Sequence, residues 1–297
     1  MTRYVAFAND AGIQSALLAR LDTYLANGTV SDAGVRRTGS AGPPSGCIAS
    51  HADPCAFEST TGYPAGLAFL LDYLFARTIH PGDAARLAVD WFGRTTPGSD
   101  LDGVPGRLLV FMLSSTLARA EPTMDAPDVA ASLHELLELH HQAIAGTPLD
   151  RAGWSIVRAK AIAGTDAART PLGRACGRMA EAAAWDPLIS RSTLADVGAH
   201  WCEVGGQIAS AATGWTAQDG AAFHECTEVF RNEIMRSDTS LHTTDFPPFF
   251  EARQPDLHAR FITQLERTNA AFTAAVGELA RASLDCLAEA PCRRGPR

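Results

Sequence analysis

Carboxylates and histidines recur at helical spacing in three segments of the chain, which is the donor arrangement of a metal site in a helical bundle. Glu138 and His141 form a Glu-x-x-His pair, the spacing at which two side chains of one helix project into a bundle core together. Two later segments add similar stripes, and the complete set of candidate ligands is Glu138, His141, Asp196, His200, Glu203, His224 and Glu228. Carboxylate and imidazole groups suit iron, manganese or zinc. A transition metal is therefore the cofactor that such a site would take.

The same stripes have a second interpretation, as the solvated faces of amphipathic helices. The opposite face of each segment already holds apolar residues, among them Leu133 and Leu136, Leu194 and Val197, and Phe223 and Phe230. A polar face is what such a helix must present to water. A bundle metal site, in contrast, needs ligands that project inward, and the full paired pattern of glutamates is not present in the sequence. We favour solvated faces and keep a metal-dependent enzyme as the alternative.

The turn-rich segment 38–62 carries another candidate, formed by Cys47, His51 and Cys55. A thiolate next to an imidazolium is an activated nucleophile. The same three side chains could instead hold a metal together with one outside ligand. Neither spacing is diagnostic, because catalytic Cys and His residues are usually distant in sequence and zinc sites prefer a Cys-x-x-Cys pair. We favour an irregular loop with two incidental thiols, and we expect it to be the least ordered internal segment.

A third segment, residues 240–250, places three phenylalanines and a Pro-Pro pair beside His242. Exposed aromatic side chains next to a rigid proline bend can dock a partner. The alternative, which we favour, is that Phe246, Phe249 and Phe250 plug one end of a helical bundle. The sequence contains no fingerprint of a phosphate loop, a dinucleotide-binding fold or a serine hydrolase. No motif therefore commits the chain to catalysis.

The elements that must position these residues are helices throughout, because apolar residues recur with the helical period and prolines and glycines stand at the expected ends. The predicted helices span about residues 10–27, 64–78, 83–92, 105–119, 127–145, 170–184, 193–212, 217–235 and 255–287, and another begins near 147. Loops are expected at 38–62 and 237–249. No segment alternates in the manner of a β-strand. The predicted fold class is all-α, a multi-helix bundle with a long C-terminal helix.

Composition places this bundle among ordinary globular proteins. We expect an N-terminal helical half, residues 1–165, and a C-terminal half, residues 166–297, packed as one unit. The net charge of −8 argues against a nucleic-acid partner, which needs a basic face. Apolar runs stay far below the ~20 residues that a membrane span requires, and the N-terminus lacks the features of a signal peptide. The seven cysteines are odd in number and scattered, which predicts reduced thiols in the cytoplasm.

One stretch of the chain has a familiar pattern. Residues 62–75, GYPAGLAFLLDYLF, resemble the Gly-Ile-Pro-x-x-Leu-Ala-x-Leu-x-Asp-x-Ile-Phe stretch of an uncharacterised bacterial family of alanine-rich helical proteins. The likeness continues through residues 97–101 and 142–146, and it covers about residues 62–165. The resemblance implies a helical fold. It implies no activity and no functional residues, and it does not extend over 170–297.

These observations favour a soluble helical protein that binds or interacts without catalysis. The motivation is the apolar seam of the predicted helix 255–287, which includes Leu257, Phe261 and Leu265, together with the aromatic segment described above. A seam of this length must pack along several partners, either within the chain or on a second copy. A protein partner or a homo-oligomer through the C-terminal helix is therefore expected. A metal-dependent enzyme is the alternative, and an enzyme using the cysteine loop is third.

Overall fold

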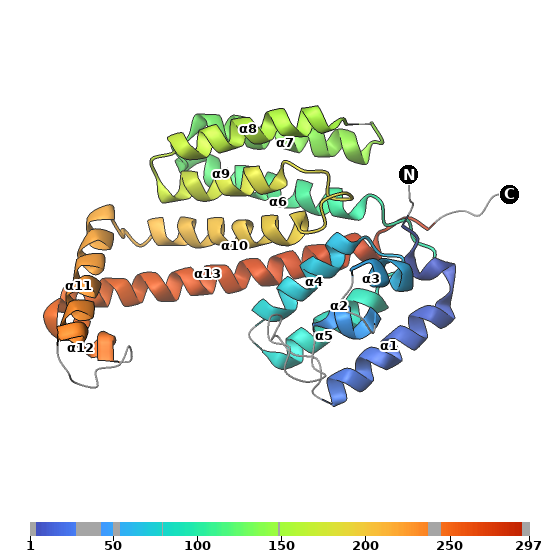
Figure 1. Ribbon diagram of the computed structural model, residues 1–297, viewed down its shortest axis with the longest axis horizontal. Coiled ribbons are helices and arrows are strands. Elements are labelled where there is room, and N and C mark those ends of the chain that lie inside the picture. The colour runs from blue at the N-terminus through green and yellow to red at the C-terminus, as the bar shows by residue number, and fades with distance from the viewer. Residues whose placement is uncertain are drawn as a thin grey trace. The chain divides into compact units, whose positions relative to one another are not determined.

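The computed structural model describes residues 4–27, 43–49, 54–78, 80–147, 149–236 and 245–292. Within these ranges the chain forms thirteen α-helices and two short 3-10 turns, and no strand longer than an isolated bridge is present (Figure 1). The last helix, α13 (Pro255–Ala288), has 34 residues. The predicted all-α fold with a long C-terminal helix is confirmed. None of the helices in the described ranges combines the length and the apolar run that crossing a bilayer requires.

The first five helices pack around a group of buried aromatic rings. They are α1 (Ala11–Ala26), α2 (Pro44–Ala49), α3 (Pro54–Thr61), α4 (Ala65–Arg77) and α5 (Pro81–Gly93). Tyr63, between α3 and α4, is fully buried, and its ring centroid lies 5.6 Å from that of Phe7 and 5.5 Å from that of Phe92. Its hydroxyl donates to the carbonyl of Trp91 at 3.4 Å. Burial of these large rings, each among the greatest apolar surfaces of the chain, stabilises this part of the fold.

The next four helices form a closed bundle. They are α6 (Val104–Ala120), α7 (Pro127–Ile144), α8 (Arg151–Ala167) and α9 (Pro171–Ala183), shown in green in Figure 1. Each helix packs against the next, and α9 also packs against α6 and α7. Short connections join neighbouring helices, which makes the neighbours antiparallel. Close approach of α8 and α9 relies on Gly177, where an added Cβ atom would lie 2.1 Å from the hydroxyl oxygen of Thr165.

Helices α10 (Thr193–Ala211), α11 (Ala217–Arg236), α12 (Phe246–Arg253) and α13 complete the chain. By its internal contacts the chain divides into two compact units, Met1–Val204 with Thr273–Arg297, and Gly205–Phe272. The division predicted from the sequence at 165/166 falls inside α8 and differs from this one. Helices α10 and α13 each contribute residues to both units.

The core of the unit Gly205–Phe272 is aromatic. Phe250 of α12 is buried together with Cys226 and Leu257, and several partly buried rings surround them. Phe223 of α11 stacks on Phe261 of α13 with ring centroids 4.5 Å apart. The rings that complete the group are Trp215, Phe230, Phe246 and Phe249. The phenylalanines beside the Pro-Pro pair therefore pack against rings of the same unit.

Two predicted loops contain helices, and the predictions were wrong in these places. Residues 38–42 and 50–53 lie outside the described ranges, but α2 and α3 occupy much of the segment predicted as irregular. Pro44 and Pro54 begin these helices, where a missing N–H group is not needed. Buried Ile48 and Phe57 then hold them against the fold.

The segment predicted as a Pro-Pro loop, 237–249, is corrected for the same reason. Residues 237–244 lie outside the described ranges, and α12 begins at Phe246. Its two prolines stand in the first helical turn, where proline is compatible with the helix. Residues 246–249 of the predicted loop are therefore helical, and Phe250 of the same helix is buried.

Both ends of the described chain attach to one short strip, residues 97–101. The amide of Leu101 donates to the carbonyl of Tyr4 at 3.0 Å, and the amide of Asp100 donates to the carbonyl of Pro291 at 2.9 Å. Gly62 makes room for the N-terminal segment, because it has φ +73° and an added Cβ would lie 2.0 Å from the carbonyl oxygen of Val5. The strip thus joins segments from the beginning and the end of the sequence.

Candidate functional site

Helix α7 exposes its predicted metal ligands. Glu138 and His141 are both exposed to solvent on this helix. The buried histidine is the intervening His140, whose Nε2 lies 2.9 Å from the carbonyl oxygen of Ala183 on α9. The Glu-x-x-His pair therefore projects outward, and the residue between its members faces the bundle.

The stripe on α10 is partly engaged in ion pairs. Glu203 is bound by the guanidinium of Arg178 on α9, and its other oxygen lies 3.2 Å from Nδ1 of His200. Asp196, one turn earlier, is exposed. A carboxylate that already binds a guanidinium has less capacity to act as a metal ligand. The residues of this stripe are therefore surface charges, and Glu203 is the one that binds to neighbouring side chains.

The stripe on α11 is similar, since His224 is exposed and Glu228 pairs with Arg231 at 2.6 Å. Across the ranges that the structure describes, no three His, Cys, Asp or Glu side chains converge as a metal site requires. The predicted ligands are thus distributed over separate contacts. The structure offers no grouping of them from which a metal centre could be built.

The cysteine candidates also separate. Cys47 is buried on α2, whereas Cys55 is exposed on α3. His51 lies outside the described residues. The sulfur of Cys55 accepts a hydrogen bond from Arg191 at 3.2 Å, a partner that is distant in sequence and that the spacing of Cys47, His51 and Cys55 does not indicate.

A cleft of about 550 Å³ opens between α8 and the segment that follows α9. We call it the tryptophan cleft, and its main lining residues are Trp154, Arg158, Ile162, Ala184, Trp185 and Ile189. Its volume lies within the roughly 300–1,000 Å³ of ordinary small-molecule sites. Trp185 and Ile189 are 40% and 79% exposed, although both are large apolar residues. The cleft therefore combines a suitable volume with apolar surface that the chain itself leaves uncovered.

Arg158 is the polar centre of this cleft. Its Nη2 donates to Glu181 at 2.7 Å, and its guanidinium carbon lies 5.1 Å from the ring centroid of Trp185. The Nε atom is buried and has no hydrogen-bond acceptor among the described residues. The arginine is held in place by one carboxylate and one ring, and it retains an N–H group without a partner. The side chain as a whole is 38% exposed, so other N–H groups of the guanidinium can donate to an acceptor in the cleft.

Trp154 presents a second unpaired donor. The side chain is 6% exposed, and its indole Nε1 has no acceptor among the described residues. Its ring centroid lies 4.9 Å from that of His140. Burial lowers the pKa of His140 to about 4, so this imidazole is neutral near pH 7. Because the carbonyl of Ala183 can only accept, the proton of His140 stands on Nε2 and its Nδ1 is a bare acceptor.

The charges around the cleft balance. Arg151 and Arg158 contribute two positive charges, and Asp186 with Glu181, the partner of Arg158, contributes two negative charges. Polar groups beyond these are the hydroxyls of Ser155 and Ser190. A site with no net charge and excess N–H donors suits an uncharged ligand that carries an oxygen acceptor.

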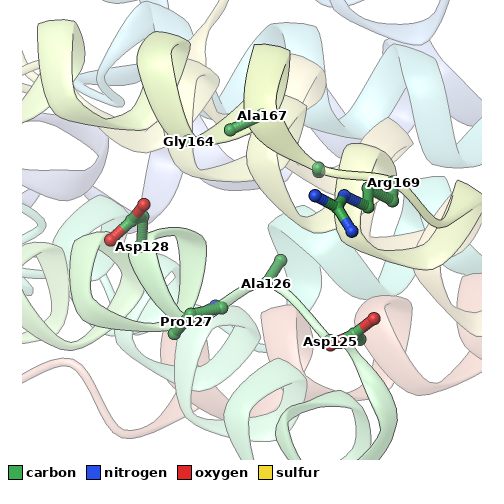
Figure 2. A pocket seen from close by; sticks show the side chains of 8 residues that line it. Asp125, Ala126, Pro127, Asp128, Gly164, Ala167 and Arg169 are labelled. Carbon is green, nitrogen blue, oxygen red and sulfur yellow. The ribbon is translucent and has the colours of Figure 1, made fainter.

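A smaller pocket lies at the beginning of α7 and is shown in Figure 2. Ala126 and Pro127 enter the helix on one side, and Gly164 and Ala167 of α8 lie on the other. Its volume of about 230 Å³ is below the range of small-molecule sites, and Asp128 and Asp125 accompany its single arginine, Arg169. We assign no function to this pocket.

Comparison of the chain with protein-family models, with curated proteins and with solved structures finds no match. The functional interpretation therefore depends on geometry alone. Sequence reasoning did not find the tryptophan cleft, because its halves lie on α8 and after α9. The signals it could have used are Trp154 and Trp185, two of only five tryptophans in the chain, each with an arginine nearby in sequence.

Proposed function

We propose that the chain is a non-catalytic binding protein and that the tryptophan cleft is its binding site. The observation that carries this proposal is the guanidinium of Arg158, whose side chain is 38% exposed, held 5.1 Å from the exposed ring of Trp185 in the lining of the cleft. A planar ligand can cover the exposed part of that ring while an oxygen atom accepts from the guanidinium of Arg158. The chemical class that fits is an uncharged aromatic compound bearing a carbonyl group.

A binding role through the C-terminal helix receives less support. Leu257, Val276 and Leu279 of its apolar seam are already buried by other parts of the chain. The large apolar residues exposed on this helix are Ile262 and Leu265, at 37% and 40%. Two partly exposed side chains form a smaller surface than a stable protein interface requires. The metal-dependent enzyme is a prediction from the sequence alone. The described residues add no support to it, because the predicted ligands do not lie together.

The setting we propose for this function is the cytoplasm. The basis is the odd and scattered set of seven cysteines, which is typical of proteins that keep their thiols reduced. Cys176 and Cys202 are buried and behave as small apolar side chains of the core.

The test uses Prodan, an uncharged naphthyl ketone whose emission shifts to the blue in an apolar site. We expect saturable binding to the full chain with a blue shift. Ala159→Phe fills the cleft from α8 and should abolish this binding, because Ala159 is exposed and lines the cleft. Ala163→Phe is the matched control, since Ala163 is exposed on the same helix outside the lining.

A second variant tests the aromatic contact. Trp185→Ala should weaken Prodan binding by about tenfold, which corresponds to about 1.4 kcal/mol. Thermal unfolding of each variant, followed by circular dichroism, establishes that the fold is retained. Binding that survives Ala159→Phe, or that falls equally with Ala163→Phe, contradicts the assignment to this cleft.

A further inference from the structure

A second hollow of the unit Met1–Val204 with Thr273–Arg297 lies between α5 and the last part of α13, beside the end of α4. It has a volume of about 600 Å³, and we call it the arginine groove. Residues of α5 line one wall at helical spacing, namely Asp83, Arg86, Leu87 and Asp90. Residues of α13 line the other wall. The tryptophan cleft shares no residue with this groove.

Three helices each bring one arginine to the groove. They are Arg77 at the end of α4, Arg86 of α5 and Arg281 of α13. Among the residues that the structure describes, neither Arg86 nor Arg281 has an ion-pair partner. Of the two carboxylates in the lining, Asp90 is bound to Arg94 at 3.0 Å. The groove is therefore positive at its rim, in a chain whose net charge is −8.

The floor of the groove is apolar. Leu87, Val276 and Leu284 line it and are 7%, 3% and 8% exposed. They are buried, whereas the three arginines of the lining are exposed. A ligand that satisfies both parts carries a negative group and an apolar body.

Gly277 keeps this surface open. A Cβ atom added at Gly277 would meet no heavy atom within 4 Å, so no close packing requires glycine here. Glycine inside a helix nevertheless weakens that helix relative to alanine. Gly277 weakens α13 and no close packing explains it, but it does line the groove. We therefore connect the glycine with the open space of the groove. Its missing side chain leaves open space in the lining of the groove.

We propose that the arginine groove binds an organic phosphate, with the phosphate on Arg86 and Arg281 and the apolar body over Val276. A guanidinium group can donate two parallel hydrogen bonds to two oxygen atoms of one phosphate. A phosphate monoester carries more than one negative charge near pH 7, so it can bind two arginines. Arg86 and Arg281 come from different helices and attract the phosphate. Their combined charge exceeds that of Asp83, the lining carboxylate that is not bound to Arg94. This proposal is independent of the ligand in the tryptophan cleft.

The experiment is calorimetric titration of the full chain with phenyl phosphate, inorganic phosphate and phenol. Phenyl phosphate should bind at least about tenfold more tightly than either of the others, because only it uses both the rim and the floor. Equal affinity for inorganic phosphate would overturn the role of the apolar floor. Equal affinity for phenol would overturn the role of the arginines.

Variants locate the site. Arg86→Gln and Arg281→Gln should each weaken phenyl phosphate binding by about tenfold or more, whereas Arg267→Gln, an exposed arginine of α13 outside the lining, should leave it unchanged. Gly277→Leu fills the groove and should abolish binding while the melting temperature is kept or raised, because leucine favours helix. Unchanged affinity in Gly277→Leu, or equal losses in all three arginine variants, contradicts the proposal.

Discussion

Asp72 of α4 holds the beginning of α2 by binding Ser45 twice. Its Oδ1 accepts from the backbone amide of Ser45 at 3.0 Å, and its Oδ2 accepts from the hydroxyl of the same residue at 2.5 Å. The carboxyl group is largely removed from water. Burial raises its pKa to about 6, and the two hydrogen bonds from Ser45 offset part of that effect.

This contact predicts a pH-dependent stability. The pKa is higher in the folded chain than the ordinary value of 3.8, so the folded state binds the proton more tightly. The resulting stability is fully present below about pH 4 and is lost as the pH rises through about 6, by roughly 3 kcal/mol. Asp72→Asn keeps both contacts without ionising, and urea unfolding of this variant should lack that loss. Identical pH profiles for the two proteins would contradict the assignment.

His140 predicts a dependence of the opposite sign. Its pKa falls from 6.5 to about 4 on burial, so the unfolded chain binds the proton more tightly. Stability from this group is present above about pH 6.5 and is lost as the pH falls through 4, again by roughly 3 kcal/mol. His140→Gln can still donate to the carbonyl of Ala183 and should remove this loss. Because the windows of Asp72 and His140 overlap, the parent should show a smaller slope than either variant.

Two glycines inside helices should respond oppositely to the same substitution. Gly277→Ala meets no atom within 4 Å and should stabilise the chain by about 0.5–1 kcal/mol. Gly177→Ala places its Cβ 2.1 Å from the hydroxyl oxygen of Thr165 and should destabilise the bundle by about 1–3 kcal/mol. Chemical unfolding of both variants measures the difference. A destabilised Gly277→Ala would contradict the open space at this position.

The polar stripe of α10 supplies a test of the metal alternative. Asp196 is exposed, so Asp196→Ala should change stability by no more than about 0.5 kcal/mol. Glu203→Ala removes the pairs with Arg178 and His200 at the surface and should cost up to about 1 kcal/mol. A chelator should leave the unfolding midpoint of the parent unchanged. Larger losses at both positions, or a midpoint that falls with chelator, would favour a bound metal.

Most of the helices could be predicted from the sequence because their signals are local. Apolar periodicity and a proline at the first position define α7, which was predicted at 127–145 and is found at Pro127–Ile144. The helices α2 and α3 could not be predicted this way. Six and eight residues are too few to show a period, and burial of Ile48 and Phe57 depends on residues far away in sequence.

The candidate sites were less predictable for the same physical reason. A stripe such as Asp196, His200 and Glu203 is visible in one segment, but its partner Arg178 comes from another helix. The arginine groove unites three helices, and neither the spacing around Arg86 nor that around Arg281 indicates the other. Sites that form between helices become visible only when the packing of those helices is known.

The strip 97–101 also sets an order for assembly during synthesis. The carbonyl of Ala6 can accept from Gly98 soon after the first hundred residues have left the ribosome. The other partner, Pro291, is made almost last, so the amide of Asp100 must wait until nearly the whole chain has been translated. The end of α13 therefore packs against the N-terminal part of the chain late in synthesis. Until α13 is in place, Leu87 and the apolar residues near it are exposed to solvent and to other proteins.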